Sequence, residues 1–317
     1  MTSPPDRLTL RVRETKVEAD DVRSIVLEHP DGSALPAWAP GAHIDVHIPT
    51  VGTRQYSLCG DPADENAWHI AVLREQDSRG GSVFLHDVLE AGAPLSTGAP
   101  RNNFPLSPAG HYEFVAGGIG ITPLLPMLAE LTAAGASWRL HYGGRRRDRM
   151  AFLGRLGAYG DRVVLWPEDE RDLLPVAEIT AAAGPDGLVY CCGPGPLLDA
   201  VEKACAAAGA TARVERFKPR EPDAGPRAET AFAVLVERTG QLVPVQPDQS
   251  ILDALADAGL DVPSSCREGT CASCETTVLA GEVDHRDSVL TESERQTGTT
   301  MMICVSRSHS ERLTLDL

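Results

Sequence analysis

Hydrophobic and polar residues alternate along much of the first hundred positions. The run AHIDVHIP (42–49) and the first half of LTLRVRETKVE (8–18) place an apolar side chain at every second position, which is typical of strands that bury one face. Between such runs little of the sequence has a helical period. The pattern predicts an antiparallel β-barrel domain over residues 1–107. The remaining runs of this kind are VRSIVLEHP, RQYSL and WHIAVLRE.

The pattern changes after residue 107, where apolar strands alternate with helical segments. A helix is expected at TPLLPMLAEL (122–131), with Thr122 as its N-cap and Pro123 at its first position. This alternation predicts an α/β domain with a parallel sheet over residues 108–217. The expected strands are YEFVAGG, SWRLHYGG, RVVLWPED, GLVYCC and ARVERF.

Glycines gather where the first of these strands meets the helix. Ligands of parallel sheets bind at the carboxyl ends of the strands, and Gly117, Gly118 and Gly120 would let a pyrophosphate approach the N-terminus of the helix. Pro123 stands where the G-x-G-x-x-G fingerprint has its third glycine. Nucleotide binding and a simple tight connection are therefore both open interpretations of the glycines alone.

A third domain follows a stretch without periodicity. The segment KPREPDAGPRAE, from residue 218, is rich in proline and charge, so residues 218–228 are predicted to be a flexible or semi-extended tether. Beyond it, AVLVERTGQLVPVQ (233–246) predicts a hairpin, and SILDALADAGL (250–260) predicts a helix capped by Ser250.

The cysteines of this last domain carry a metal-site signature. Of the eight cysteines in the chain, Cys266, Cys271 and Cys274 form C-x4-C-x2-C, and Cys304 follows at a distance. This is the plant-type spacing for a [2Fe–2S] cluster. The alternative is a structural zinc site, which usually combines two close cysteine pairs. The spacing favours iron and sulfur, and residues 229–317 are predicted to form a β-grasp ferredoxin.

Charge and composition narrow the function further. Acidic residues outnumber basic ones 45 to 29, for a net charge of −16, which argues against a nucleic-acid partner. No stretch approaches the ~20 apolar residues of a membrane span, and the N-terminus lacks the apolar core of a signal peptide. We therefore expect a cytoplasmic protein without a membrane partner. Residues 229–317 hold 15 acidic and 6 basic residues, which indicates either a solvated surface or a docking face.

Four motifs together with the cysteines resemble the ferredoxin-NAD(P) reductase superfamily. They are RQYSLCGDP (54–62), SRGGSVFLHD (78–87), GGIGITP and CCGPGP. The order of flavin barrel, nicotinamide domain and C-terminal ferredoxin resembles the phthalate dioxygenase reductase family, which includes vanillate demethylase reductases. The resemblance covers essentially the whole chain. It departs from this branch at Ala272, where glycine is common, and a small side chain is expected to be tolerated.

The resemblance implies a set of site residues. Arg54, Tyr56 and Ser57 would hold a flavin, with Tyr56 stacked on the ring and Ser57 near its N5. The backbone of Ala71, Val72 and Leu73 would meet the polar edge of the ring. Gly80, Gly81 and Ser82 would cradle a terminal phosphate, which implies FMN. Thr122 and Phe217 would lie near the flavin, and Cys192 and Gly193 would lie beside the nicotinamide. The residues expected to take part in catalysis are Ser57, Thr122 and Cys192; the metal ligands are Cys266, Cys271, Cys274 and Cys304. Taken singly, Tyr56 could be barrel core and Cys192 could be structural.

The resemblance also implies an activity. Electrons would pass from NAD(P)H through FMN and the [2Fe–2S] cluster to an oxygenase component. A Rieske-type non-haem iron oxygenase acting on an aromatic substrate is the favoured partner. A cytochrome P450 is the main rival, and a redox carrier or sensor without sustained turnover is a further alternative. The resemblance favours NADH, although Arg145 to Arg147 could bind the 2′-phosphate of NADPH. The protein is expected to be a monomer.

Overall fold

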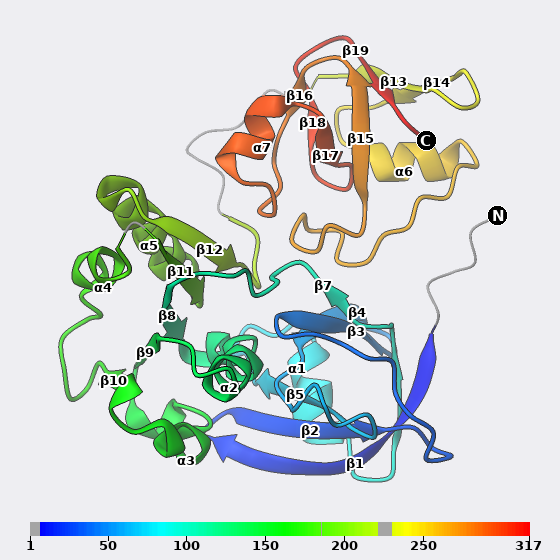
Figure 1. Ribbon diagram of the computed structural model, residues 1–317. Helices are drawn as coiled ribbons and strands as arrows, with labels where there is room; N and C mark the ends of the chain where they lie inside the picture. The colour runs from blue at the N-terminus through cyan, green and yellow to red at the C-terminus, as the bar shows by residue number, and fades with distance from the viewer. Residues whose placement is uncertain (1–6, 185, 221–229) are drawn as a thin grey trace. The chain divides into compact units, whose positions relative to one another are not determined.

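The computed structural model describes residues 7–184, 186–220 and 230–317. Its chain divides into two compact units, Met1–Glu215 and Arg216–Leu317 (Figure 1). Most of the predicted tether, residues 221–228, lies outside the described residues. Each unit has hydrophobic cores of its own.

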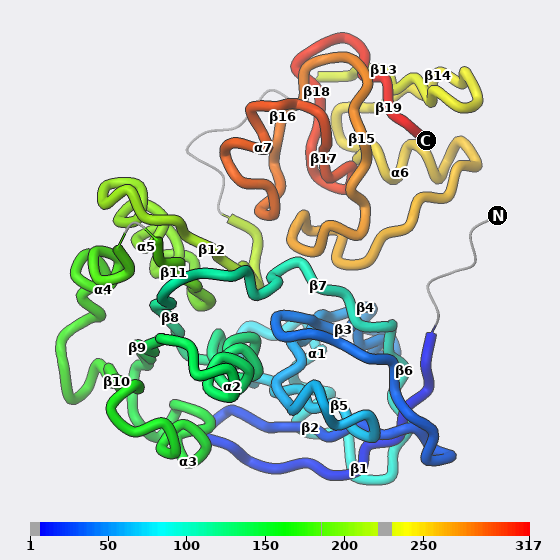
Figure 2. Tube along the Cα trace, in the orientation of Figure 1, coloured from blue at the N-terminus to red at the C-terminus, as the bar shows by residue number. Residues whose placement is uncertain are grey.

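The first sheet of the first unit is an antiparallel barrel, as the alternating pattern predicts. Its strands follow the order β4-β3-β6-β1-β2-β5, and β7 pairs with β3. The two ends of this order meet where Leu58 bridges to Ile70 and the Cys59 N–H donates to the His69 carbonyl over 2.8 Å. Figure 2 traces the chain through these strands. They are β1 (Leu8–Ala19), β2 (Val22–Glu28), β3 (Ala42–Ile48), β4 (Gly52–Ser57), β5 (Trp68–Leu73), β6 (Pro94–Thr97) and β7 (Arg101–Asn102).

A helical segment interrupts the barrel where the sequence pattern indicates little helix. It consists of α1 (Gly81–Val83) and η1 (Phe84–Val88) and starts after Gly80, whose φ is 96°. His86 Nε2 lies 2.8 Å from the Val72 carbonyl, and Arg23 donates to the carbonyls at positions 85 and 86. The segment is therefore fixed against β5 and β2 by side-chain contacts between distant parts of the chain.

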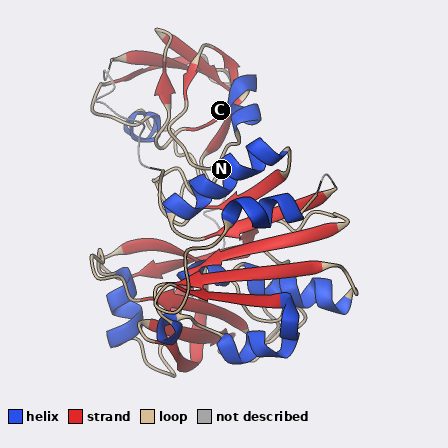
Figure 3. Ribbon diagram, turned by 90° about the vertical axis from the view of Figure 1, so that its left-hand side faces the viewer, coloured by secondary structure: helices blue, strands red, loops and turns tan. Residues whose placement is uncertain are grey.

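The second sheet of this unit is fully parallel, in the order β10-β9-β8-β11-β12. Helix α2 packs on one face with Phe114 and Leu140, and α4 and α5 pack on the other with Val115 and Val189 (Figure 1, Figure 3). The strands are β8 (His111–Gly117), β9 (Trp138–Gly144), β10 (Val163–Pro167), β11 (Gly187–Cys192) and β12 (Thr211–Glu215); the helices are η2 (Gly118–Ile121), α2 (Leu124–Ala133), η3 (Arg147–Arg149), α3 (Leu153–Leu156), η4 (Gly157–Arg162), α4 (Val176–Ala182) and α5 (Gly195–Ala208).

The start of α2 differs from the expectation. The helix begins at Leu124 with Pro123 in the N-cap position, and no side chain caps it. The Thr122 hydroxyl instead donates to the Ile119 carbonyl over 3.0 Å, within the preceding turn of η2. The expectation failed because η2 runs almost directly into α2, so the first N–H groups of α2 follow a helical turn rather than a loop.

The second unit has the β-grasp arrangement expected for a ferredoxin. Its main sheet follows the order β14-β13-β19-β15-β17, with β19 parallel to β13, and β16 pairs with β18. The predicted N-cap is confirmed, because the Ser250 hydroxyl accepts the Asp253 N–H over 3.0 Å. The elements are β13 (Phe232–Val236), β14 (Gln241–Val245), α6 (Ile251–Asp257), β15 (Glu275–Ala280), β16 (Val283–Asp284), α7 (Glu292–Thr297), β17 (Thr300–Met302), β18 (Arg307–Ser308) and β19 (Arg312–Leu315).

Candidate functional site

The cysteine loop of the second unit runs between α6 and β15. Arg267, Gly269 and Ala272 in this loop have φ angles of 57°, 68° and 55°, so the backbone turns repeatedly through the left-handed region. These turns aim N–H groups at sulfur: the Glu268 N–H lies 3.3 Å from the Cys266 Sγ. Backbone donors directed at sulfurs suit a cluster held by thiolates.

The four predicted ligands fall into two pairs. A hydrogen bond with Cys271 lowers the pKa of the Cys266 thiol to about 5, and a hydrogen bond with Cys304 lowers the pKa of Cys274. Among the described residues, no group of three or more Cys, His, Asp or Glu side chains is arranged to hold a single metal ion. Cys266, Cys271 and Cys274 lie on one loop and Cys304 lies in the turn after β17, so the four thiols would hold the two irons of such a cluster and supply their thiolate ligands. The residues present thus fit a [2Fe–2S] cluster better than zinc.

The backbone at Ala272 gives a physical reason for the glycine that the resemblance leads us to expect there. A φ of 55° is disfavoured for residues that carry a Cβ, by roughly 1 kcal/mol or more. Alanine has the smallest side chain with a Cβ, so it carries this conformational cost but adds no further bulk. The departure therefore strains the loop slightly without blocking the pairing of the cysteines.

In the first unit, a polar cluster forms where the barrel meets the parallel sheet. It brings together Ser57 at the end of β4, Cys192 at the end of β11 and Glu215 at the end of β12. The Cys192 Sγ and the Glu215 carboxylate are 3.9 Å apart. Burial raises the pKa of Glu215 to about 8, while Ser57 and Cys192 act to lower it. Burial and the nearby Glu215 raise the pKa of the Cys192 thiol well above its usual value. The site thus holds a carboxyl that keeps its proton near neutral pH and a thiol that stays protonated.

Glu215 was missed by sequence reasoning. It follows Arg213 and Val214 in a strand whose alternation gives no hint of function. Its position beside Ser57 and Cys192 depends on the parallel pairing of β11 with β12, which aligns Cys192 with Glu215. The only available signal was that a carboxylate closes a strand at the carboxyl edge of a parallel sheet, the edge where ligands bind.

Three of the predicted nucleotide-binding glycines have a packing role. A Cβ on Gly120 would lie 2.1 Å from the Cys192 carbonyl oxygen, and one on Gly117 would lie 2.6 Å from the Pro194 Cδ. A Cβ on Gly193 would lie 3.0 Å from the Gly117 Cα. Only Gly118 has open space around it, with a φ of 55°. The glycines therefore let the ends of β8 and β11 approach each other, and this brings Cys192 to its place.

The predicted phosphate turn brings a cation and backbone N–H groups together. A Cβ on Gly81 would lie 3.0 Å from the Arg54 Cγ, so the arginine lies directly against the turn. The Ser82 hydroxyl donates to the Ser78 hydroxyl over 2.9 Å and accepts the Glu75 N–H over 3.1 Å. A positive side chain beside a glycine turn at the start of a helical segment can bind a phosphate.

The remaining predicted flavin residues line the edge of the barrel. Tyr56 is only partly buried against the barrel core, and burial raises its pKa to about 12. Ala71 and Val72 are buried near the end of β5, where Leu73 packs against the core of the parallel-sheet region. Phe217 is 41% exposed and belongs to the second unit, so its approach to the flavin stays a prediction.

Comparisons with known proteins agree with this geometry. Residues 234–309 match the family described as "2Fe-2S iron-sulfur cluster binding domain". The phenoxybenzoate dioxygenase subunit beta of Ectopseudomonas oleovorans is 45% identical over 313 residues, which cover 98% of this chain and 97% of that protein. No helix in the described part of the chain has the length and apolar character needed to cross a membrane.

Two solved structures match almost the whole chain. An intact type IV self-sufficient cytochrome P450 monooxygenase is 44% identical, with a TM-score of 0.90 over 98% of this chain; the chain spans only 41% of that protein. A phthalate dioxygenase reductase, described as a modular structure for electron transfer from pyridine nucleotides to [2Fe–2S], is 37% identical, with a TM-score of 0.70 and 98% coverage of both chains. The chain therefore belongs to the phthalate dioxygenase reductase family and is an iron–sulfur oxidoreductase of an oxygenase system.

Proposed function

We propose that the protein takes hydride from NADH, carries the electrons through FMN and a [2Fe–2S] cluster, and delivers them singly to a Rieske-type oxygenase that acts on an aromatic substrate. One observation carries the proposal: a single chain combines the Ser57–Cys192–Glu215 cluster with two sulfur pairs. The alignment with a dioxygenase subunit covers 98% of the residues of this chain.

The phosphate turn supports FMN as the flavin. Arg54 lies against Gly81, and the Gly80 N–H and the Ser82 hydroxyl both donate to the Ser78 hydroxyl, so a cation and two donors lie close together in a turn that suits a terminal phosphate. When bound, a flavin supplies the conversion between two-electron and one-electron transfer. Tyr56 would stack on the ring, and the backbone of residues 71–73 would meet its polar edge.

The Ser57–Cys192–Glu215 cluster would position the nicotinamide. Since burial raises the pKa of Glu215 to about 8, this side chain is mostly protonated at neutral pH and can donate a hydrogen bond. Ser57 comes from the barrel and Cys192 from the parallel sheet, so together they can hold reacting groups from both regions in register. Alignment of this kind accounts for much of the rate in hydride transfer. Thr122 supports the same region through its bond to the Ile119 carbonyl.

The arginines after β9 support NADH over NADPH. Arg147 makes a two-pronged ion pair with Glu170, at 2.8 and 2.6 Å, and Arg146 pairs with Asp148. An arginine that is already paired with a carboxylate has fewer N–H groups available to bind a 2′-phosphate, and the negative carboxylate repels the phosphate. Two of the three consecutive arginines are therefore committed within the protein.

A cytochrome P450 is the second candidate partner. The specific observation in its favour is the 44% identity to the matching 41% of a self-sufficient cytochrome P450 monooxygenase. The two candidates require the same chemistry from this chain and differ only in the protein that receives the electrons.

The test measures NADH-driven product formation by the purified full-length protein with each type of oxygenase. We expect turnover with a Rieske-type aromatic oxygenase and little with a stand-alone P450. The control is Cys304→Ala, which should retain NADH–ferricyanide activity while losing turnover with the oxygenase. Equal support of the oxygenase by this variant would refute the cluster as the exit for electrons, and a preference for the P450 would reverse the choice of partner.

A further inference from the structure

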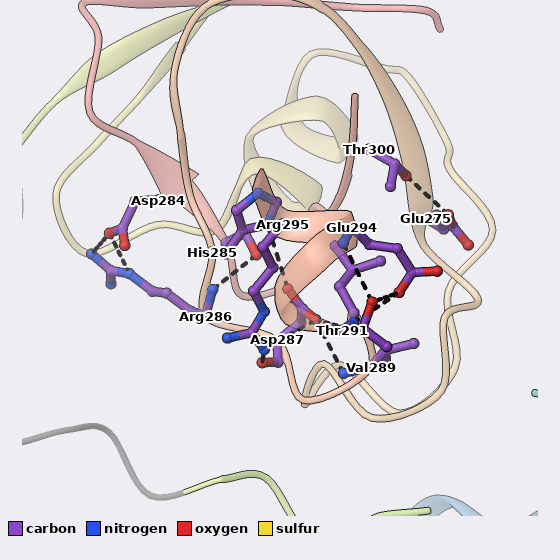
Figure 4. Close-up of polar contacts among 12 residues, drawn as sticks. Glu275, Asp284, His285, Arg286, Asp287, Val289, Thr291, Glu294, Arg295 and Thr300 are labelled. Atoms are coloured by element: carbon purple, nitrogen blue, oxygen red, sulfur yellow. Dashed lines mark hydrogen bonds and ion pairs between the residues drawn. The ribbon is translucent and has the colours of Figure 1, made fainter. Parts of the chain in front are cut away.

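A buried carboxylate lies next to the cysteine loop in the second unit. The Asp287 side chain is fully buried, and its Oδ2 accepts the N–H groups of Val289 and Leu290 over 3.0 and 2.8 Å (Figure 4). These two bonds fold residues 287–290 into a tight turn, which is called the Asp287 turn below. A buried acidic side chain is costly unless its partners compensate for lost hydration, so its presence calls for a reason.

Two cationic or ionisable side chains flank this carboxylate. Arg295, from α7, lies 3.7 Å from the Oδ2 and donates to the backbone carbonyl of Asp287. His285 lies 3.7 Å from the Oδ1 on the other side. Within the described part of the chain, Asp287 Oδ1 and both ring nitrogens of His285 lack hydrogen-bond partners. The Asp287 turn is thus anchored to α7 by Arg295, and α7 is itself fixed by the capping box between Thr291 and Glu294.

The Asp287 turn is bound directly to the cysteine loop. The Ser288 N–H donates to the Gly269 carbonyl over 2.8 Å. A Cβ on Gly269 would lie 3.1 Å from the Asp287 Cα and 3.3 Å from its Cβ, so the two backbones touch. The residue before this glycine, Glu268, directs its N–H at the Cys266 sulfur, 3.3 Å away. One peptide segment therefore connects Asp287 to a predicted iron ligand.

Hydrogen bonds to ligand sulfurs affect how easily a cluster is reduced. Reduction adds negative charge, and an N–H directed at a sulfur stabilises that charge, so such bonds raise the reduction potential. We propose that Asp287 is a positioning residue for the [2Fe–2S] centre, because it holds the Gly269 segment where the adjacent Glu268 N–H meets the Cys266 sulfur and thereby raises the potential of the cluster. This inference rests on the proposed [2Fe–2S] site.

The test compares three variants of the full-length protein. Asp287→Ala removes both turn hydrogen bonds and the anchor of Arg295. Asp287→Asn removes the charge but keeps an oxygen that can accept the N–H groups of Val289 and Leu290. Ser288→Ala is the matched control, since it removes a neighbouring side chain and keeps the backbone N–H that binds Gly269.

The readouts are iron content, the midpoint potential of the cluster, the EPR spectrum of the reduced protein and thermal stability. We expect Asp287→Ala to lower the potential and alter the EPR spectrum, Asp287→Asn to restore most of the potential, and Ser288→Ala to match the unmodified protein. If Asp287→Ala does not retain iron, Arg295→Lys carries the test, because it keeps the charge and loses the planar fork; a smaller fall in potential is then expected.

Two results would overturn the inference. An unchanged potential in Asp287→Ala or Arg295→Lys, with lower thermal stability only, would make the role purely structural. Equal rises in potential in the alanine and asparagine variants would show that the carboxylate acts through its charge. Absence of iron from the unmodified protein would instead overturn the proposed function, so the two failures are distinguishable.

Discussion

Replacing Gly120 with alanine tests whether close backbone packing places Cys192 in the site. The added Cβ would lie 2.1 Å from the Cys192 carbonyl oxygen, 2.4 Å from its carbonyl carbon and 2.7 Å from the Gly193 nitrogen. These atoms belong to the backbone and cannot rotate away, unlike the tip of a side chain. Ordinary van der Waals contact of a Cβ begins at 3.4 Å, so the end of β11 must shift by about 1 Å.

The shift has a cost in stability and in rate. Overpacking of a buried contact costs about 1–3 kcal/mol, and we place this substitution near the upper end because both partners are backbone. For a unit of this size, ~3 kcal/mol lowers the melting temperature by roughly 6–12 °C. A displacement of about 1 Å at reacting groups can slow catalysis on the order of a hundredfold, so NADH–ferricyanide turnover should fall by about that factor.

The assay pairs thermal unfolding, followed through the release of flavin fluorescence, with steady-state NADH–ferricyanide kinetics. Gly195→Ala is the matched control, because Gly195 begins α5 and a Cβ there would meet no atom within 4 Å. If Gly120→Ala melted and turned over like Gly195→Ala, the close approach of η2 to the end of β11 would have no role in positioning Cys192.

Three further predictions follow from the same structure. Because the folded-state pKa of Glu215 is raised to about 8, the stability that this side chain contributes is full below about pH 4.5 and is lost as pH rises toward 8. Glu215→Gln should therefore reduce the difference in unfolding free energy between pH 6 and pH 8.5, measured by urea unfolding. An unchanged difference would contradict the burial of the carboxyl. Glu170→Gln frees Arg147 and should raise kcat/KM for NADPH relative to NADH by about tenfold, the worth of one charge-assisted hydrogen bond of ~1.5 kcal/mol; no change in the ratio would place the ribose elsewhere. Cys304→Ala should abolish the visible bands of the cluster and leave the flavin bound, whereas zinc without iron in anaerobically purified protein would refute the iron–sulfur assignment.

Much of the fold follows from local pattern. Alternation along β1 and β3 and the strand–helix alternation after residue 107 predict a barrel and a parallel sheet, because each signal depends only on neighbouring residues. The cysteine spacing predicts the metal site for the same reason, since three ligands lie on one loop.

The parts that were not predicted depend on tertiary contacts. Glu215 joins Ser57 and Cys192 across more than 150 residues of sequence, and no local pattern carries that information. The helical segment after Gly80 is fixed by His86 and Arg23 from outside its own sequence window. The burial of Asp287 was not predicted either, because an aspartate in a polar stretch of sequence is expected to face solvent rather than to pack beneath the cysteine loop.

The pairing of β19 with β13 has a consequence for how the second unit folds. β19 lies between β13 and β15, and Leu313 and Leu315 are fully buried there. During synthesis, the β13–β14 hairpin and α6 appear long before the strand that covers their open edge. Such non-local pairing slows folding and leaves a sheet edge exposed in the meantime. The cysteine loop therefore emerges before the sheet beside it is complete, and delivery of iron and sulfur would best be timed to follow the arrival of β19.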